Sequence, residues 1–202
     1  MTRAVIFDVG NVLIRWDARL VFGDLLPEPG ATDAFMAEVG FDAWNLEQDR
    51  GRSWDEGVAV LSTAHPHRAG LIAAFRDRWQ ESVPGDIPGT VEILEALRGA
   101  GVPLYAITNF SAEKWLESVA RFPFLGSAFR DVVVSAHEGL VKPDPAIFEV
   151  CLRRNGLRAG DCVFVDDSAR NIAAAAALGF DAVHFTGPEA LRAALAGRGL
   201  PA

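Results

Sequence analysis

From residue 87 onward, helical and strand-like segments alternate, and this alternation constrains the fold more than any other feature of the sequence. Apolar runs predict strands at 103–107, 131–135, 162–165 and 182–185, and the stretches between them predict helices. Strands connected through helices form parallel sheets with helices packed on both faces. This part of the chain therefore predicts an α/β protein built on a parallel sheet.

Residues 5–13, V-I-F-D-V-G-N-V-L, predict one more strand near the N-terminus. The apolar run leads into Asp8, and Gly10 and Asn11 follow it. We expect a buried strand that carries Asp8 to the edge of the sheet, with a turn at the glycine. One short motif fits equally well a turn in which Asp8 is only a capping residue, so the other motifs have to decide.

Between these two parts, residues 16–86 change to a helical pattern. Ser53 and Glu56 fit a helix-capping box, and Leu71, Phe75 and Trp79 form an apolar stripe in a helix predicted near 68–82. Further helices are predicted near 18–26 and 31–39. The sequence thus predicts an all-helical insertion between the first strand and the rest of the chain.

Charge and hydropathy argue against a nucleic-acid-binding protein and against a membrane protein. The net charge of −8 disfavours nucleic acid as a partner, because phosphate backbones are bound by clusters of Lys and Arg. No apolar run reaches membrane-spanning length, and the start of the sequence lacks a signal-type apolar region. We therefore expect a cytoplasmic protein whose partner is a small molecule, with no membrane contact and no obligate protein partner.

Polar residues stand directly after the predicted strands, and one lysine precedes a predicted helix. They are Asp8, Thr108 with Asn109, Asp166 with Asp167, and Lys142 in G-L-V-K-P-D-P. Ligands of open parallel sheets bind outside the carboxyl ends of the strands, so we expect these side chains to converge there. Taken singly, the aspartate pair could cap a helix, the threonine could be a turn hydroxyl and the lysine could be solvated.

The motifs F-D, I-T-N, V-K-P-D-P and V-D-D-S-x-x-N resemble those of the haloacid dehalogenase (HAD) superfamily, in the same order and over nearly the whole chain. The resemblance implies an α/β fold with a Rossmann-like parallel sheet core at 1–15 and 87–202 and a small inserted helical cap domain at 16–86. Its capped phosphatase branch implies a Mg²⁺-dependent phosphatase of small phosphorylated metabolites.

The resemblance also implies roles for individual residues. Asp8 would be the nucleophile that forms an aspartyl-phosphate, which water then hydrolyses, and Lys142 would neutralise phosphate charge and restrain Asp8. Phosphate binding would fall to Thr108, Asn109, Gly10 and Asn11. The ligands of Mg²⁺ would be Asp8, the backbone carbonyl of Gly10, Asp166 and Asp167.

One position departs from the pattern of the superfamily's phosphatases. They usually carry a second aspartate two residues after the nucleophile as general acid and base, and here that position is Gly10. Loss of a general acid costs about 10² to 10⁴ in rate. The string D-V-G-N-V is similar to the starts of bacterial phosphatases of alpha-glucose 1-phosphate, whose anomeric leaving group partly offsets the loss. Sugar 1-phosphates are therefore candidate substrates.

Two other functions remain open at this point. The missing carboxylate fits a catalytically weak, phosphate-binding or regulatory relative of these enzymes. In a 2-haloacid dehalogenase, Asp8 would attack carbon and no metal would be needed, but Asp166 and Asp167 would repel a substrate carboxylate.

Substrate choice is expected to come from the insertion, and in particular from 44–51, W-N-L-E-Q-D-R-G. Trp44, Gln48 and Arg50 are candidate contacts there, as are Arg15 and Trp16 at the hinge. The alternative is that the tryptophans pack the interior of the insertion and the charged side chains are solvated.

Overall fold

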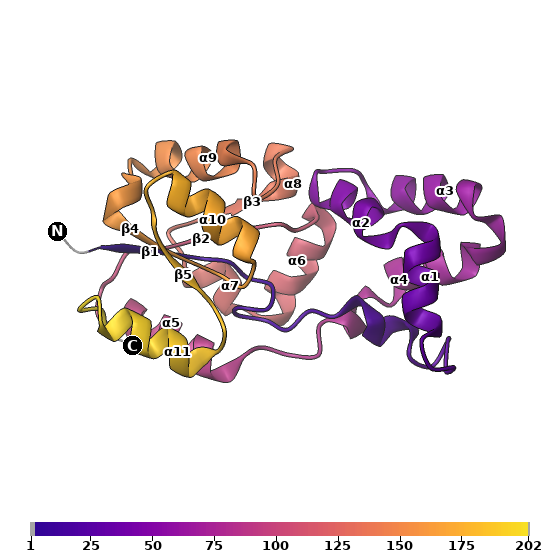
Figure 1. Ribbon diagram of the computed structural model, residues 1–202, viewed down its shortest axis with the longest axis horizontal. Helices are drawn as coiled ribbons and strands as arrows, with labels where there is room; N and C mark the ends of the chain where they lie inside the picture. The colour runs from indigo at the N-terminus through magenta and orange to yellow at the C-terminus, as the bar shows by residue number, and fades with distance from the viewer. Residues whose placement is uncertain (1–2, 202) are drawn as a thin grey trace.

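The computed structural model describes residues 3–201, and its centre is one five-stranded sheet (Figure 1). The strands are β1 (Ala4–Phe7), β2 (Leu104–Thr108), β3 (Asp131–Val134), β4 (Cys162–Asp166) and β5 (Asp181–His184). All neighbouring strands pair in parallel, in the order β3-β2-β1-β4-β5. The predicted α/β fold with a parallel sheet is confirmed.

Helices cover both faces of the sheet, because alternate side chains of each strand point to opposite sides. Val5 and Phe7 of β1 pack in one apolar cluster, with α5 (Pro88–Gly99), α6 (Ala112–Arg121) and α11 (Pro188–Ala196). Ile6 packs in the other, with α9 (Pro145–Asn155) and α10 (Ala169–Ala177). The short elements α7 (Phe124–Ser127), α8 (Ser135–Glu138) and η4 (Ala159–Asp161) complete the core.

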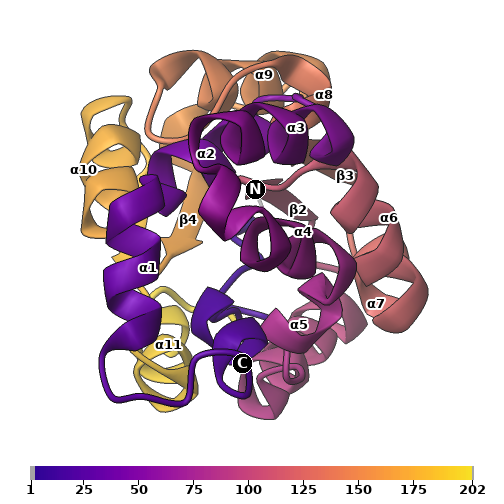
Figure 2. The same ribbon diagram turned by 90° about the vertical axis from the view of Figure 1, so that its right-hand side faces the viewer.

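Residues 18–82 fold into helices that lie at one end of the sheet (Figures 1 and 2). They are η1 (Ala18–Phe22), α1 (Ala31–Val39), α2 (Phe41–Asp49), α3 (Trp54–Ala64), η2 (Pro66–Arg68), α4 (Ala69–Asp77) and η3 (Trp79–Ser82). Aromatic rings fill this unit: Phe41 meets Phe75 edge to face at 4.7 Å, and Trp44 meets Trp54 at 5.6 Å. The structure shows the helical insertion that the change of pattern predicts, and we call residues 18–82 the cap.

Three expectations about the cap helices differ from the structure. The helix predicted near 18–26 is the shorter 3₁₀ helix η1, which ends at Phe22. The single helix predicted near 68–82 is α4 between two 3₁₀ turns, because the chain departs from helical geometry at Arg68 and again at Arg78. The sequence analysis proposed no helix at 41–49, where α2 begins at Phe41 directly after Gly40, whose φ of 63° lies in the left-handed region. A glycine adopts this conformation without strain.

Two chain segments join the cap to the sheet and lie side by side. Arg15 N donates to Gly85 O at 2.8 Å, and Asp17 N donates to Ser82 O at 2.8 Å. The division at residues 16 and 86 remains a prediction, and this pairing of the two connections agrees with it. Within residues 3–201, no helix combines the length and apolarity needed to cross a membrane.

Candidate active site

A buried lysine lies between two carboxylates at the carboxyl end of the sheet. Asp8 directly follows β1 and Asp166 ends the neighbouring strand β4, so strand pairing places them close together. Lys142 Nζ, from the loop before α9, lies 2.8 Å from Asp8 Oδ1 and 2.7 Å from Asp166 Oδ2. The side chains of Lys142, Asp8 and Asp166 are 1%, 11% and 0% exposed. The fold therefore joins three predicted site residues from distant parts of the sequence.

Further donors fix the orientation of these carboxylates. Asp8 Oδ1 accepts a hydrogen bond from the N–H of Val9 at 2.7 Å. Asp166 Oδ1 accepts from the N–H of Ser168 at 2.8 Å, and Asn171 Nδ2 lies 3.0 Å from both oxygens of Asp166. Asn171 is the asparagine of V-D-D-S-x-x-N, to which the sequence analysis gave no role. The position of Asn171 in the first turn of α10, close to the end of β4, could have suggested a role in the site.

Burial dominates the electrostatics of this cluster. It raises the pKa of Asp8 to about 7, while the charge of Lys142 opposes the shift and that of Asp166 adds to it. Burial alone would lower the pKa of Lys142, but the charges of Asp8 and Asp166 outweigh this effect, so that the pKa is raised. Loss of hydration and then the charge of Asp166 raise the pKa of Asp167. One lysine thus faces an excess of negative charge.

The three aspartates form a set of ligands that suits a divalent cation. Asp8, Asp166 and Asp167 each offer a carboxylate oxygen, and these atoms lie within 4.8 Å of one another. Mg²⁺ prefers hard oxygen ligands and is bound in proteins through a few carboxylates together with water and substrate oxygens. A cation among the three carboxylates also balances the charge that Lys142 leaves uncompensated. The donor set therefore fits Mg²⁺.

Thr108 and Asn109 stand at the end of β2, beside the strand that carries Asp8. Thr108 is the last residue of the strand and is 1% exposed. Asn109 Nδ2 donates to Lys142 O at 3.0 Å, and its Oδ1 accepts from Lys142 N at 2.8 Å. The amide of Asn109 therefore positions the lysine loop. Because both polar atoms of the side-chain amide are bonded to Lys142, we propose the backbone N–H of Asn109 as its phosphate-binding group.

Gly10 and Asn11 form the turn after β1. Asn11 has a φ of 55°, in the left-handed region that asparagine tolerates better than most residues. Its N–H donates to Ile14 O at 2.7 Å, and its Oδ1 accepts from the N–H of Trp16 at 2.9 Å. The side-chain oxygen of Asn11 thus fixes the start of the connection to the cap.

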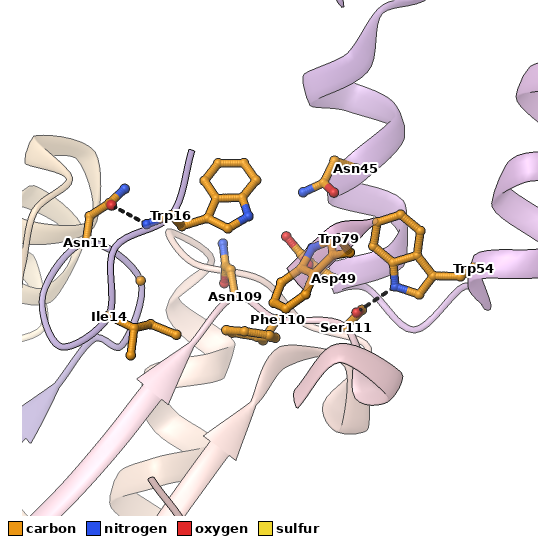
Figure 3. A pocket seen from close by; sticks show the side chains of 11 residues that line it. Asn11, Ile14, Trp16, Asn45, Asp49, Trp54, Trp79, Asn109, Phe110 and Ser111 are labelled. Carbon is orange, nitrogen blue, oxygen red and sulfur yellow. Dashed lines mark hydrogen bonds between the residues drawn. The ribbon is translucent and has the colours of Figure 1, made fainter. Parts of the chain in front are cut away.

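A cavity of about 210 Å³ lies between this edge of the sheet and the cap (Figure 3). Its apolar walls are Ile14, Trp16, Trp54, Trp79 and Phe110. Its polar lining is Asn11, Asn45, Asp49, Asn109 and Ser111, and Gly10 also borders it. Among the lining residues described by the structure there is no lysine and no arginine.

Trp44 and Gln48, predicted to contact substrate, lie inside the cap and do not line this cavity. Trp44 Nε1 donates to Gly57 O at 2.7 Å, and the fully buried Gln48 donates from Nε2 to Trp44 O at 2.8 Å. The next residues along, Asn45 and Asp49, line the cavity from α2 (Figure 3). The prediction named the correct segment, 44–51, but the two residues it chose pack inside the cap.

Of the other three predicted substrate contacts, one lines the cavity and two do not. Trp16 lines the cavity from the connection to the cap. Arg15 Nη1 donates to Asp86 O at 2.7 Å across the two connecting segments, and Arg50 pairs with Glu47 at 3.1 Å on the exposed side of α2. Neither arginine is part of the cavity lining.

Several residues of the cavity were not found from the sequence. Phe110 and Ser111 directly follow the I-T-N motif, so extending that motif could have indicated them. Trp54 begins α3 next to its cap residue, and Trp54 Nε1 donates to Ser111 Oγ at 2.8 Å. Asp49 carried no signal of its own, because its helix had not been predicted.

Comparison with protein families agrees with this geometry. A family model described as haloacid dehalogenase-like hydrolase matches residues 2–179. The chain belongs to this family. The HAD-like hydrolase resembles a sesquiterpene phosphatase of Aspergillus oryzae, with 28% identity covering 91% of this chain and 90% of the relative. It is also 29% identical to a phosphoglycolate phosphatase of Xanthomonas campestris, over 90% of this chain and 81% of that enzyme.

Some relatives are much longer than this HAD-like hydrolase. Mouse acyl-CoA dehydrogenase family member 10 is 28% identical over 93% of the chain, but the chain spans only 18% of that protein. Among solved structures, a HAD family enzyme of Bacteroides thetaiotaomicron in complex with magnesium and inorganic phosphate has a TM-score of 0.74 at 20% identity, covering 93% and 96% of the two chains. An L-2-haloacid dehalogenase has a TM-score of 0.68 at 20% identity, covering 92% and 86%. These structures share the fold.

Proposed function

We propose that this HAD-like hydrolase is a Mg²⁺-dependent phosphatase of small phosphorylated metabolites that reacts through an aspartyl-phosphate on Asp8. The observation that carries the proposal is the carboxylate of Asp8 at the sheet edge, held 2.8 Å from Lys142 within a group of three aspartates. Phosphatases among its relatives, which resemble it over most of their length, support the same reaction class.

The residues of the cluster have distinct tasks in this reaction. Asp8 attacks phosphorus while the bond to the leaving oxygen breaks, and water then attacks the aspartyl-phosphate and releases inorganic phosphate and free Asp8. Lys142 and the N–H of Val9 hold Asp8 Oδ1, so the carboxylate is already oriented before substrate binds. Thr108 and the backbone N–H of Asn109 bind phosphoryl oxygens at the end of β2.

Asp8, Asp166, Asp167 and the backbone carbonyl of Gly10 would hold Mg²⁺. When bound, the ion supplies positive charge that stabilises the phosphoryl group as negative charge develops on it. The excess of carboxylates over lysine in the cluster supports this assignment.

The cavity favours an uncharged leaving group. Its walls are largely aromatic, and the one titratable side chain among its described lining residues is an acid, Asp49. A substrate that carries a second anionic group there, such as phosphoglycolate, would find no lysine or arginine among the described lining residues to compensate its charge. The lining of the cavity supports sugar 1-phosphates as substrates, because the aromatic rings offer apolar faces and the asparagines and Ser111 offer hydrogen bonds.

The same observation disfavours a 2-haloacid dehalogenase, whose substrate carboxylate would also require a cation in the cavity. The catalytically weak, phosphate-binding alternative rests on Gly10, and measurable turnover of the native protein would exclude it.

Phosphate release from a metabolite panel tests the proposal. We expect the purified protein to release phosphate from sugar 1-phosphates with Mg²⁺, to lose activity in EDTA and to regain it when Mg²⁺ is restored. We expect phosphoglycolate to be a poorer substrate. Asp8→Asn should abolish turnover, whereas Asp55→Asn, which changes a cap side chain that is 89% exposed, should not. Absence of phosphate release from every member, or halide release from 2-haloacids that persists in EDTA, would contradict the proposal.

A further inference from the structure

The structure offers no steric reason for the missing acid two residues after Asp8. A Cβ at Gly10 would meet no atom within 4 Å, and the φ of Gly10 lies outside the left-handed region. An aspartate could therefore stand at this position without strain. Asn11, the next residue, has an amide that does not exchange protons usefully near neutral pH. A proton for the leaving group has to come from elsewhere in the site.

The cap brings one carboxyl group to the cavity. Asp49 is the last residue of α2 and lines the same cavity as Gly10 and Asn109. Asn45, one turn earlier on the helix, lines it as well, so this face of α2 is directed at the cavity (Figure 3). Among the described lining residues, Asp49 is the one group that can gain and lose a proton near neutral pH.

Hydrogen bonds fasten this part of the cap to the loops after β2 and β3. Ser135 Oγ donates to the backbone oxygen of Asp49 at 2.6 Å and accepts from the N–H of Phe110 at 2.8 Å. Trp54 adds two bonds: its Nε1 donates to Ser111 Oγ at 2.8 Å, and its N–H donates to Glu113 Oε1 at 3.1 Å. The end of α2 is therefore held against the edge of the sheet where Asp8 reacts.

The surroundings of Asp49 favour the protonated carboxyl. Asp49 makes no ion pair in the described part of the chain, and burial raises its pKa to about 7, with a hydrogen bond from the N–H of Ser111 acting in the opposite direction. A general acid and base works best when its pKa lies near the working pH.

Resting on the phosphatase function proposed above, we propose that Asp49 is the proton donor and acceptor that Gly10 does not provide. In the first step Asp8 forms a bond to phosphorus, the bond between phosphorus and the leaving oxygen breaks, and the carboxyl proton of Asp49 passes to that oxygen. In the second step water attacks the aspartyl-phosphate, and its proton returns to the Asp49 carboxylate as Asp8 leaves. Substrate plus water thus gives alcohol plus phosphate, and both aspartates are regenerated.

The experiment compares two substrates of similar size that differ in their need for a proton. Cyclohexyl phosphate has an alcohol leaving group that requires protonation, whereas para-nitrophenyl phosphate has an activated leaving group that does not. With Mg²⁺ present, Asp49→Asn should lower kcat/KM for cyclohexyl phosphate by about 10² to 10³ and for para-nitrophenyl phosphate by less than about threefold. Asp55→Asn, the same change at an exposed cap residue, should alter neither value.

A second variant tests whether a proton donor is what has been lost. The double variant G10D/D49N should have a kcat/KM for cyclohexyl phosphate at least about tenfold above that of Asp49→Asn alone, because it supplies a carboxyl group at the other position. An equal loss on both substrates, or no loss on either, in a wild-type protein that is active would overturn the role of Asp49. Wild-type protein that is inactive on both substrates and on the metabolite panel would instead overturn the phosphatase function itself.

Discussion

Two buried lysines lie beside the cavity, and neither is among its lining residues. We call the cluster of Asp8, Lys142 and Asp166 at the sheet edge the floor, and the cap side chains Asp49, Trp54 and Trp79 the roof. The two lysines have different surroundings. In the floor, Lys142 lies between Asp8 and Asp166, with both oxygens within 2.8 Å of its Nζ. Toward the roof, the Nζ of Lys114 lies 5.7 Å and 5.8 Å from the ring centres of Trp54 and Trp79. The floor holds concentrated charge, and the roof consists mainly of aromatic surface.

This difference separates two tasks. Charge fixed at close range in a buried site acts strongly on a phosphoryl group, so in the function that we propose the floor carries out the reaction. Aromatic surface contributes contact area that depends on the size and polarity of the leaving group, so we assign substrate selection to the roof. Asp49 is the exception, since it is a roof residue to which we assign a chemical step.

The substitution with the largest expected effect on activity is Asp8→Asn in the floor. We expect it to lower kcat by at least about 10⁴, because no other group can take over as nucleophile, while leaving the protein folded. Steady-state phosphate release and circular dichroism measure the two properties. Residual activity within about tenfold of wild type would place the nucleophile elsewhere.

The two lysines should differ in their contribution to stability. Lys142→Met leaves two buried carboxylates without their partner and should lower the free energy of unfolding by about 3–5 kcal/mol. Lys114→Met removes cation–π contacts and the hydrogen bonds to Arg76 O and to the partly exposed Glu117, and should cost about 1–2 kcal/mol. Urea unfolding in EDTA provides the values.

Addition of Mg²⁺ should affect the stability of the two lysine variants differently. An excess of the ion should recover part of the loss in the Lys142 variant, because a cation among the aspartates again compensates their charge. The Lys114 variant should gain no more than wild type does. Equal losses in EDTA, or equal recovery with Mg²⁺, would show that floor and roof do not differ in this way.

Ionisation of the buried Asp49 should lower the free energy of unfolding as pH rises. Its pKa is raised to about 7 in the folded protein by burial, above the ordinary value of 3.8, so the folded state binds its proton more tightly than the unfolded state does. Stability from this group is complete below the ordinary value and is lost as pH rises toward about 7. Asp49→Asn should therefore be more stable than wild type by about 1–2 kcal/mol above that pH and equal near pH 4. A difference that does not change with pH would contradict this expectation.

The smallest expected effect concerns two tryptophans of the cap. Trp54→Phe removes the hydrogen bond to Ser111 in the cavity wall and should lower kcat/KM about 3- to 10-fold, mainly through KM. Trp44→Phe removes a comparable bond to Gly57 inside the cap and should leave KM unchanged. Kinetics on one sugar phosphate compare the two variants. A larger KM effect at Trp44 would favour the prediction made from the sequence.

Much of the floor could be predicted from the sequence, because a strand end is a local feature with a fixed place in a parallel sheet. The pattern of apolar runs places Asp8, Thr108 and Asp166 at strand ends, and parallel pairing brings such ends to one edge. The helical insertion follows from a change of period that is visible in the sequence alone. The roles of these residues came from resemblance, since spacing alone assigns no chemistry.

Tertiary structure decided which residues of the roof face the cavity. Successive residues of a helix point about 100° apart, so a shift of one position exchanges the packed face for the exposed one. The sequence indicates the segment 44–51, but the packing of α2 against α3 directs Trp44 and Gln48 inward and leaves Asn45 and Asp49 at the cavity. Hydrogen bonds from Ser135 and Trp54 then hold this face over the site. These contacts join residues far apart in the chain, so only the folded structure could reveal them.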